Sequence, residues 1–333
     1  MNIIEFGDCR EIMRKWAMLG FKAQICVTSP PYYGLRDYGH PGQLGLEKSP
    51  DEYVKSMVEV FRCVRDVLAD DGTLWLNLGD SYARTGGTQG GGNRELMHME
   101  GAQARMCAIP EGSGLKAKDL IGIPWRVAFA LQADGWYLRQ DIIWHKPNPM
   151  PESVTDRCTK AHEYIFMLSK APRYYYDHNA IKTPMAQSSV DRLSQDVGNQ
   201  KGSDRVPGKT NGNMKAVGKI DKQRGHSRRH AGFNDRWDSM TKEEQFQGGA
   251  NKRSVWTVAT RPYKGAHFAT FPEALIDPCV LAGSRSADIV LDPFMGSGTT
   301  AAVALKHGRQ YLGCELNPDY EVLQRERLLK IQS

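Results

Sequence analysis

Short apolar runs alternate with amphipathic segments along the first part of the chain. The period-two and period-3.6 patterns predict strands and helices that follow one another at short intervals. Strands are expected over 3–6, 23–27 and 73–78, and helices over 10–19 and 51–68, the second helix being stopped by Asp70-Asp71-Gly72. Such alternation is typical of an α/β fold in which helices cover a parallel sheet.

The same alternation returns twice further along the chain. A helix is expected over 124–131, strands over 136–145, 164–169, 287–291 and 310–314, and helices from 299 to about 307 and from about 318. Residues 83–118 and 176–254 lack either pattern, so the first is expected to be a long loop and the second an insertion. The sequence therefore predicts one core built from 1–175 and 255–333.

Composition is compatible with a single large core. The chain has 333 residues, of which 40% are hydrophobic and 25% charged, and 33 are glycines. The N-terminus has no long apolar run, so we expect neither a signal peptide nor a membrane anchor. Its seven cysteines are scattered without a metal-binding spacing, which indicates reduced thiols, a cytoplasmic protein and no metal site.

Positive charge is concentrated in the insertion. The formal net charge is +6, and between Lys201 and Arg253 there are thirteen Lys or Arg residues against six Asp or Glu. This stretch is rich in Gly, Asn and Ser, so composition alone leaves two interpretations open. It is either a solvated linker or a nucleic-acid-binding segment whose basic side chains neutralise phosphates.

A glycine turn is the first chemical feature. Gly296 and Gly298 stand where a strand meets a helix, which lets a ligand approach the backbone and the free N–H groups of the helix. Glu315 ends the next strand, where a carboxylate can hold the two hydroxyls of a ribose. The glycine pattern is incomplete for a pyrophosphate, so an adenosine without pyrophosphate fits better.

A second feature, Ser29-Pro30-Pro31-Tyr32, follows the strand over 23–27. Ligands of open α/β sheets bind at the carboxyl ends of strands. Two consecutive prolines leave carbonyls that can accept hydrogen bonds from a ligand, the Ser29 hydroxyl adds an acceptor, and Tyr32 offers a flat face for a base. A plain Pro-Pro turn is the alternative.

Together these segments resemble one family, the beta-class amino DNA methyltransferases. The matching segments are Thr28-Ser-Pro-Pro-Tyr32, Asp292-Pro-Phe-Met-Gly-Ser-Gly-Thr-Thr300, Gly313-Cys-Glu315, Gly7-Asp8-Cys9 and His267 to Leu275. The resemblance implies a Rossmann-like methyltransferase sheet with circularly permuted motif order and S-adenosylmethionine as cofactor. It further implies that 1–175 is the catalytic half, 255–333 the cofactor-binding half and 176–254 a target-recognition insertion.

Site residues follow from the resemblance by position. The catalytic residues would be Ser29, Pro30, Pro31 and Tyr32. The cofactor residues would be Asp8, Cys9, Thr28, His267, Phe271, Pro272, Asp292, Pro293, Phe294, Gly296, Ser297, Gly298, Thr299 and Glu315. The DNA-binding residues would be Arg224, Arg228, Arg229, Lys252 and Arg253.

The implied reaction is direct methyl transfer to the exocyclic amine of a flipped-out base in double-stranded DNA. Adenine-N6 enzymes of this family usually carry Asp where this chain has Ser29, and cytosine-N4 enzymes usually carry Ser. The resemblance therefore favours N4 of cytosine over N6 of adenine. The protein would act as a monomer or homodimer, with a restriction endonuclease as a candidate partner.

Three rival functions remain at this stage: a dinucleotide-dependent oxidoreductase, a non-catalytic nucleic-acid-binding module, and methylation of RNA or protein glutamine. Other residues also have two interpretations. Cys279 is expected to belong to the core rather than to act as a nucleophile, Asp80 to line the site or cap a turn, and His145 to Asn148 to contact DNA or form a surface turn.

Overall fold

The computed structural model describes residues 1–35, 38–83, 114–194, 239–241, 248–260 and 271–332. The chain forms two compact units, one comprising 1–180 and 253–333 and the other 181–252. Within the described residues, no helix combines the length and apolar character needed to cross a membrane.

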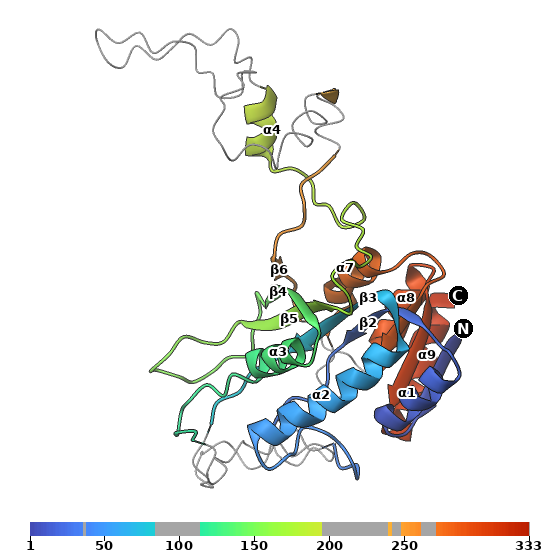
Figure 1. The fold of residues 1–333 in the computed structure, drawn as a ribbon. Helices are drawn as coiled ribbons and strands as arrows, with labels where there is room; N and C mark the ends of the chain where they lie inside the picture. Colours follow the sequence, from blue (N-terminus) through green and yellow to red (C-terminus); the bar gives the residue numbers. More distant parts are fainter. Residues whose placement is uncertain (36–37, 84–113, 195–238, 242–247, 261–270, 333) are drawn as a thin grey trace. The chain divides into compact units, whose positions relative to one another are not determined.

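One sheet of eight strands forms the centre of the larger unit (Figure 1). Among the described residues the spatial order is β1 (Asn2–Phe6), β8 (Gln310–Glu315), β7 (Ile289–Asp292), β2 (Ala23–Thr28), β3 (Leu68–Leu78), β5 (His162–Ser169), β4 (Tyr137–His145) and β6 (Val255–Thr257). The N-terminal strand pairs with β8, so the two flanks of the chain share one sheet.

The expected parallel sheet needs one correction. Strand β5 is antiparallel to both β3 and β4, and every other strand pair in the sheet is parallel. Residues 146–161 join β4 to β5 without a crossover helix, and a direct connection brings the next strand back antiparallel. The sequence pattern also missed β6, a strand of three residues at the sheet edge.

Helices pack in two rows along the sheet. In one row α2 (Pro50–Val67) contacts both α1 (Cys9–Met18) and α3 (Ile123–Ala133). In the other, α8 (Thr299–Lys306) contacts both α7 (Glu273–Gly283) and α9 (Glu321–Gln332). Every residue of β2 is buried, and its side chains alternate between the rows: Cys26 joins the cluster of α1 to α3, whereas Ile25 packs against Gly283. Strands covered on both faces are typical of α/β proteins.

Element boundaries differ from expectation at the end of α2. The helix ends at Val67, before Asp70, because Leu68 is already extended and pairs with Ala23. The register then jumps to Thr73 opposite Ile25, so Asp70 to Gly72 form an irregular part of β3. The last helix begins with a 3-10 turn, Pro318–Tyr320.

The smaller unit contains α4 (Gln187–Ser194) and an isolated bridge between Thr183 and Ala250. Most of the predicted loop over 83–118 and most of the basic segment lie outside the described residues.

Candidate active site

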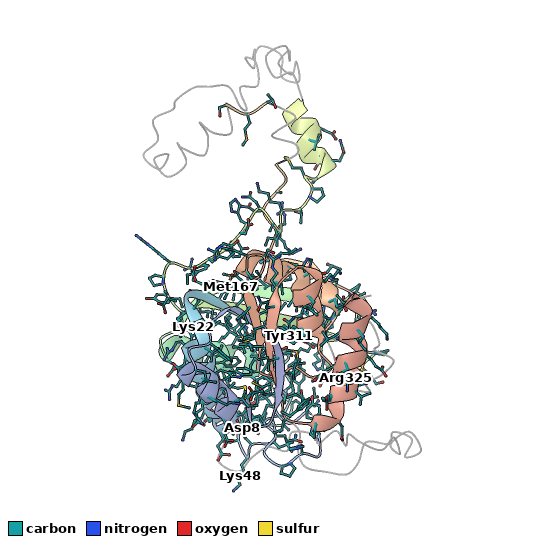
Figure 2. All side chains as sticks on the ribbon, turned by 90° about the vertical axis from the view of Figure 1, so that its right-hand side faces the viewer. Asp8, Lys22, Lys48, Met167, Tyr311 and Arg325 are labelled. Atoms are coloured by element: carbon teal, nitrogen blue, oxygen red, sulfur yellow. The ribbon has the colours of Figure 1, made fainter. Side chains whose placement is uncertain are left out.

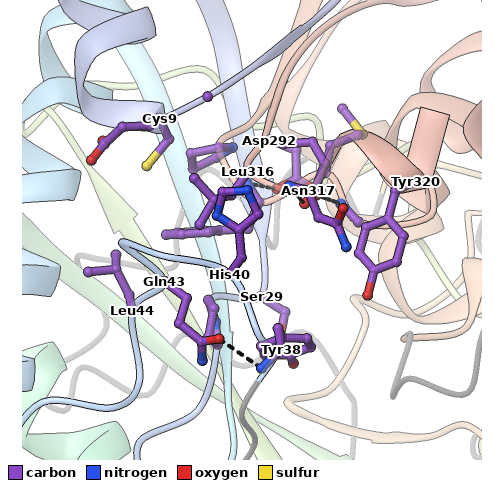
Figure 3. Close-up of a pocket in the computed structure, with 18 of the residues that line it drawn as sticks. Cys9, Ser29, Tyr38, His40, Gln43, Leu44, Asp292, Leu316, Asn317 and Tyr320 are labelled. Atoms are coloured by element: carbon purple, nitrogen blue, oxygen red, sulfur yellow. Dashed lines mark hydrogen bonds between the residues drawn. The ribbon is translucent and has the colours of Figure 1, made fainter. Parts of the chain in front are cut away.

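A pocket lies where β1, β7, β8 and β2 end (Figure 3). Its walls come from the turns that follow these strands, because parallel strands bring their carboxyl ends to one edge. Figure 2 shows Asp8, which follows β1, at the lower end of the larger unit. The pocket therefore joins segments from both ends of the sequence.

The glycine turn forms one wall. Strand β7 ends at Asp292, and α8 begins at Thr299 after Gly298, which has φ +81°. Gly296 has φ +52°, and a Cβ atom there would meet no atom closer than 3.9 Å. Both glycines adopt the left-handed conformation that other residues avoid. The turn thus leaves open space where the backbone borders the pocket.

The Asp292 side chain stabilises the glycine turn by hydrogen bonds. Its carboxylate accepts hydrogen bonds from the Thr28 and Thr300 hydroxyls, both at 2.6 Å, and from the Phe294 backbone N–H at 3.0 Å. Complete burial raises the pKa of Asp292 to about 6. Thr28, a predicted cofactor residue, is also buried and does not line the pocket; its hydroxyl contacts Asp292.

Glu315 is the other buried carboxylate of this wall. It accepts from the backbone N–H groups of Gly296, at 2.7 Å, and Asn317, at 2.9 Å. Burial raises its pKa. Each carboxylate oxygen has two lone pairs, so both can still accept from a hydroxyl in the pocket.

Asp8 differs because its partner is charged. It caps α1, and Arg10 donates to it through the backbone N–H at 2.8 Å and through Nε at 3.0 Å. The Arg10 guanidinium lowers the pKa of Asp8. Arg10 itself lines the pocket, which the sequence analysis did not anticipate.

The Ser-Pro-Pro-Tyr loop borders the pocket from β2. Ser29 and Pro31 line it, whereas Pro30 is buried and neither Pro30 nor Tyr32 is among its lining residues. The Pro31 carbonyl accepts from the Tyr53 hydroxyl at 2.8 Å. Burial raises the pKa of Tyr32, whose hydroxyl donates to Glu163 at 2.7 Å.

Most other predicted cofactor residues meet at this pocket. The lining includes Cys9, Phe271, Pro293, Phe294, Ser297 and Thr299. Pro272 caps α7, Gly298 caps α8, and His267 lies outside the described residues. The Ser297 hydroxyl is buried and has no hydrogen-bond partner among the described residues, so this polar atom is available to a ligand.

Sequence reasoning missed the outer wall of the pocket. Tyr38, His40, Gln43 and Leu44, from the loop after the Ser-Pro-Pro-Tyr segment, line it, together with Leu316, Asn317 and Tyr320. Asn317 caps the 3-10 turn, and the Asn-Pro pair directly after Glu315 was a signal that could have found it. The loop before α2 offered no comparable motif.

Two further residues with two interpretations each, Cys279 and Asp80, have structural roles. Cys279 is fully buried, as predicted for a core residue, and the described cysteines are all free thiols. Asp80 accepts from the backbone N–H groups of Gly122 and Ile123, so it caps the start of α3.

The DNA-contact predictions are not tested by the structure. Lys252 is half-buried and Arg253 exposed, and Arg224, Arg228 and Arg229 lie outside the described residues.

Comparison with known proteins identifies the family. Residues 23–325 match N6_N4_Mtase, described as DNA methylase. The chain belongs to this DNA methylase family. It is 43% identical over 327 residues to the Type II methyltransferase M.SmaI of Serratia marcescens, covering 97% of this chain and 89% of that protein. It is also 42% identical to the Type II methyltransferase M.Cfr9I of Citrobacter freundii, covering 97% and 86% respectively.

Solved structures confirm the fold of the methylase. The PvuII DNA methyltransferase (cytosine-N4-specific) superimposes with a TM-score of 0.57 at 16% identity, covering 99% of this chain and 90% of that one. The crystal structure of M1.HpyAVI gives 0.53 at 15% identity, covering 98% of both. These structures confirm the predicted Rossmann-like methyltransferase sheet, and the family match and the Type II relatives confirm the beta-class amino DNA methyltransferase assignment.

The methylase uses S-adenosylmethionine. The pocket fits this cofactor because it offers two carboxylates with spare lone pairs, an unpartnered buried hydroxyl and a glycine turn bordering open space. These groups match the hydroxyls and amines of an adenosine and the amino-acid end of a methionine.

Proposed function

We propose that the methylase transfers a methyl group to N4 of cytosine in double-stranded DNA. The observation that carries this proposal is Ser29, a neutral hydroxyl, at the pocket edge where adenine-N6 relatives usually have Asp. A protein of the same fold, the PvuII DNA methyltransferase, is named as cytosine-N4-specific, which is compatible with the proposal. Adenine N6 remains the alternative target.

Different residues would bind the cofactor and orient the target amine. Glu315 and Asp8 would hold the adenosine, and the 293–299 turn would hold the methionine end. S-adenosylmethionine supplies an electrophilic methyl group bound to a sulfonium. The Ser29 hydroxyl and the Pro30 carbonyl would accept from the exocyclic amine, which turns its lone pair out of conjugation with the ring and toward the methyl carbon.

The target base has to leave the helical stack to reach Ser29. The ring of Tyr32 would then support the flipped base, and its hydroxyl contacts would keep that ring in place. Flipping brings the exocyclic amine to the pocket edge, away from its pairing partner in the duplex.

Residues 176–254 would be the target-recognition region, as the family resemblance implies, and their basic side chains would hold the DNA by neutralising its phosphates. Replacing Arg228 and Arg229 by Ala should weaken DNA binding and reduce its dependence on salt, with cofactor affinity unchanged. The names of the Type II relatives point to a restriction endonuclease as partner.

Mass spectrometry of nucleosides from DNA methylated by the purified enzyme tests the choice of base. N4-methylcytosine is the expected product. N6-methyladenine without modified cytosine would overturn the cytosine assignment and leave the family assignment intact.

A further inference from the structure

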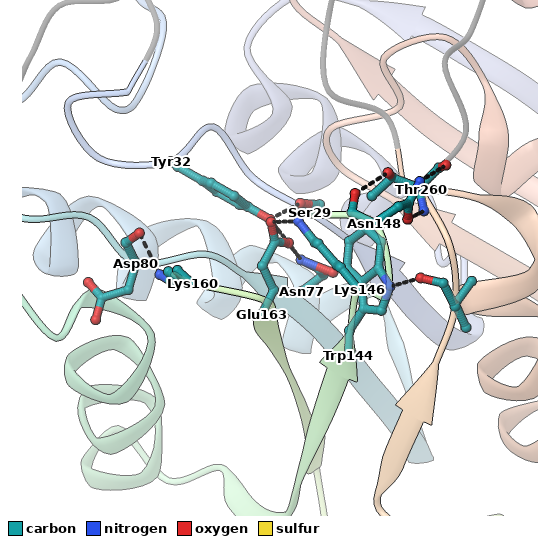
Figure 4. A network of polar contacts seen from close by, with 11 residues as sticks. Ser29, Tyr32, Asn77, Asp80, Trp144, Lys146, Asn148, Lys160, Glu163 and Thr260 are labelled. Carbon is teal, nitrogen blue, oxygen red and sulfur yellow. Dashed lines mark hydrogen bonds and ion pairs between the residues drawn. The ribbon is translucent and has the colours of Figure 1, made fainter. Parts of the chain in front are cut away.

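A chain of hydrogen bonds leads from Ser29 away from the pocket (Figure 4). The Ser29 hydroxyl lies 3.4 Å from the Tyr32 hydroxyl, and Tyr32 lies 2.7 Å from Glu163 Oε2. These residues come from two places in the sequence: the loop after β2 holds Ser29 and Tyr32, and β5 holds Glu163. The chain of contacts therefore connects the pocket edge to a carboxylate inside the sheet.

Asn77 of β3 fixes the direction of these hydrogen bonds. Its Nδ2 donates to the Tyr32 hydroxyl oxygen at 2.7 Å and to Glu163 Oε2 at 2.9 Å. An amide nitrogen cannot accept a hydrogen bond, so the Tyr32 proton points to Glu163. The Ser29 proton points in turn to Tyr32, and both hydroxyls are oriented to pass a proton toward the carboxylate.

Lys146 of β4 completes the surroundings of Glu163. Its ammonium group forms an ion pair with Glu163 Oε1 and lies 4.3 Å from the centroid of the Trp144 ring. The Lys146 side chain is 19% exposed and that of Glu163 15% exposed. The ammonium group thus holds Oε1 while Oε2 faces Tyr32, and the exposed fraction gives Glu163 a route to solvent.

Amine methylation needs such an acceptor. As the amine nitrogen bonds to the methyl carbon, the carbon–sulfur bond breaks, sulfur keeps the electron pair, and the nitrogen becomes positively charged. The nitrogen must then lose a proton. A neutral serine hydroxyl is a poor final base because its protonated form is a very strong acid, so a hydroxyl at this position needs a stronger base behind it.

We propose that Glu163 receives the proton of the target amine through Ser29 and Tyr32. The amine proton passes to Ser29 Oγ, the Ser29 proton to the Tyr32 oxygen, and the Tyr32 proton to Glu163 Oε2. Glu163 becomes neutral, both hydroxyls are regenerated, and Glu163 then releases the proton to water. This inference rests on the proposed role of Ser29 and adds the base that Ser29 itself lacks.

The test compares Glu163→Gln with Tyr32→Phe in single-turnover methylation of bound DNA, which separates the chemical step from product release. Gln keeps the size of Glu but cannot take a proton, and Phe keeps the ring of Tyr but lacks the hydroxyl. Each variant should lose roughly 100-fold or more in rate, as expected for general base catalysis. Because the two residues act in series, the double variant should be no slower than the slower single variant.

Two further measurements separate proton transfer from positioning. In Glu163→Ala, formate should restore part of the rate, because a small carboxylate can replace the missing base. Fluorescence of DNA carrying 2-aminopurine at the target position should be unchanged in Glu163→Gln, because flipping does not need the proton transfer. Asp134→Asn is the matched control. The Asp134 carboxylate lies at the C-terminal end of α3, is 11% exposed and pairs with Arg62. This variant should methylate DNA at the wild-type rate.

A wild-type rate in Glu163→Gln would overturn the proposal. A slow variant that loses the fluorescence signal, with no formate rescue in Glu163→Ala, would show that Glu163 positions Tyr32 and takes no proton. Failure of the proposed function is distinct, since the wild-type enzyme would then yield no methylated cytosine. If adenine were the product, the same variants would still test the proton path.

Discussion

Two glutamates of the same sheet, one buried and one half-buried, show how the two halves of the methylase are built. Glu315, in the cofactor half, accepts from the backbone N–H groups of Gly296 and Asn317, all within a short stretch of chain. Glu163, in the catalytic half, accepts from the side chains of Tyr32, Asn77 and Lys146, which lie far apart in the sequence. The cofactor half is shaped by backbone conformation and the catalytic half by side-chain contacts.

This difference predicts how each half fails. A change in backbone freedom should damage the cofactor half without altering its charges. Replacing a side chain by one of the same shape but different polar groups should slow catalysis in the catalytic half without altering its backbone. The two kinds of damage are separable, since cofactor affinity reports on the first and the rate of the chemical step on the second.

The largest effect is expected from Gly296→Val. The residue has φ +52°, which strains a β-branched side chain, and the new atoms would enter the pocket. Cofactor affinity should fall on the order of 1000-fold, about 4 kcal/mol, in calorimetric titration. Gly308→Val is the matched control, because Gly308 has φ +70° but does not line the pocket. Equal cofactor affinity in the two variants would contradict the role of the turn.

The next effect is expected from Ser29→Ala, which removes an acceptor at the pocket edge but leaves the backbone unchanged. The single-turnover rate should fall about 100-fold, roughly 3 kcal/mol, because the lost contact is strongest when charge develops on the amine. Cofactor affinity should stay within about twofold of wild type. If affinity fell as much as the rate, the two halves would not be separable in this way.

The same contrast explains what the sequence could predict. Glu315, Gly296 and Asp8 belong to short local motifs, so their positions at strand ends follow from the pattern of apolar runs. Glu163 and Lys146 follow no motif, and their meeting depends on β5 running antiparallel to β4, which a missing crossover helix causes and strand periodicity does not reveal.

The wall formed by Tyr38 to Leu44 was missed for a related reason. Loop residues have no periodicity, and their contact with the pocket depends on how the loop folds back on the strand ends. Arg10 was missed because an arginine on an exposed helix face is usually solvated. Here Asp8, two residues earlier, draws it to the pocket.

A pH experiment tests the burial of Asp292 in the cofactor half. Its pKa in the fold is about 6, raised by burial above the ordinary value of 3.8. The folded state therefore binds the proton more tightly than the unfolded state, and this contribution to stability is lost as the pH rises from about 4 through 6. Asp292→Asn does not titrate and should lack that loss.

The free energy of unfolding of both proteins, measured with denaturant between pH 4 and 7, checks this. Relative to Asp292→Asn, the wild type should lose stability on the order of 3 kcal/mol at most as the pH rises. A constant difference across the pH range would mean that hydroxyl and backbone donors fully offset the burial.

The smallest effect is expected at Asp8. Unlike Glu315 in the same half, Asp8 is paired with a charged side chain, that of Arg10. The Arg10 guanidinium lowers the pKa of Asp8, so the carboxylate stays charged to a lower pH than usual. Arg10→Met should weaken cofactor binding about threefold to tenfold, roughly 1 kcal/mol, because the ion pair is partly exposed. Lys15→Met is the control. Lys15 lies on the same helix as Arg10, pairs with Glu5 of β1 and does not line the pocket.

The pH dependence of this variant gives a sharper result than its affinity at neutral pH. Without Arg10 the pKa of Asp8 rises, so a proton competes with the cofactor at a higher pH than in the wild type. Cofactor affinity of Arg10→Met should therefore begin to fall at a higher pH on acidification, while Lys15→Met should follow the wild-type curve. Parallel curves for all three proteins would mean that Asp8 only caps α1, and that the cofactor half holds the adenosine without a charge-paired side chain.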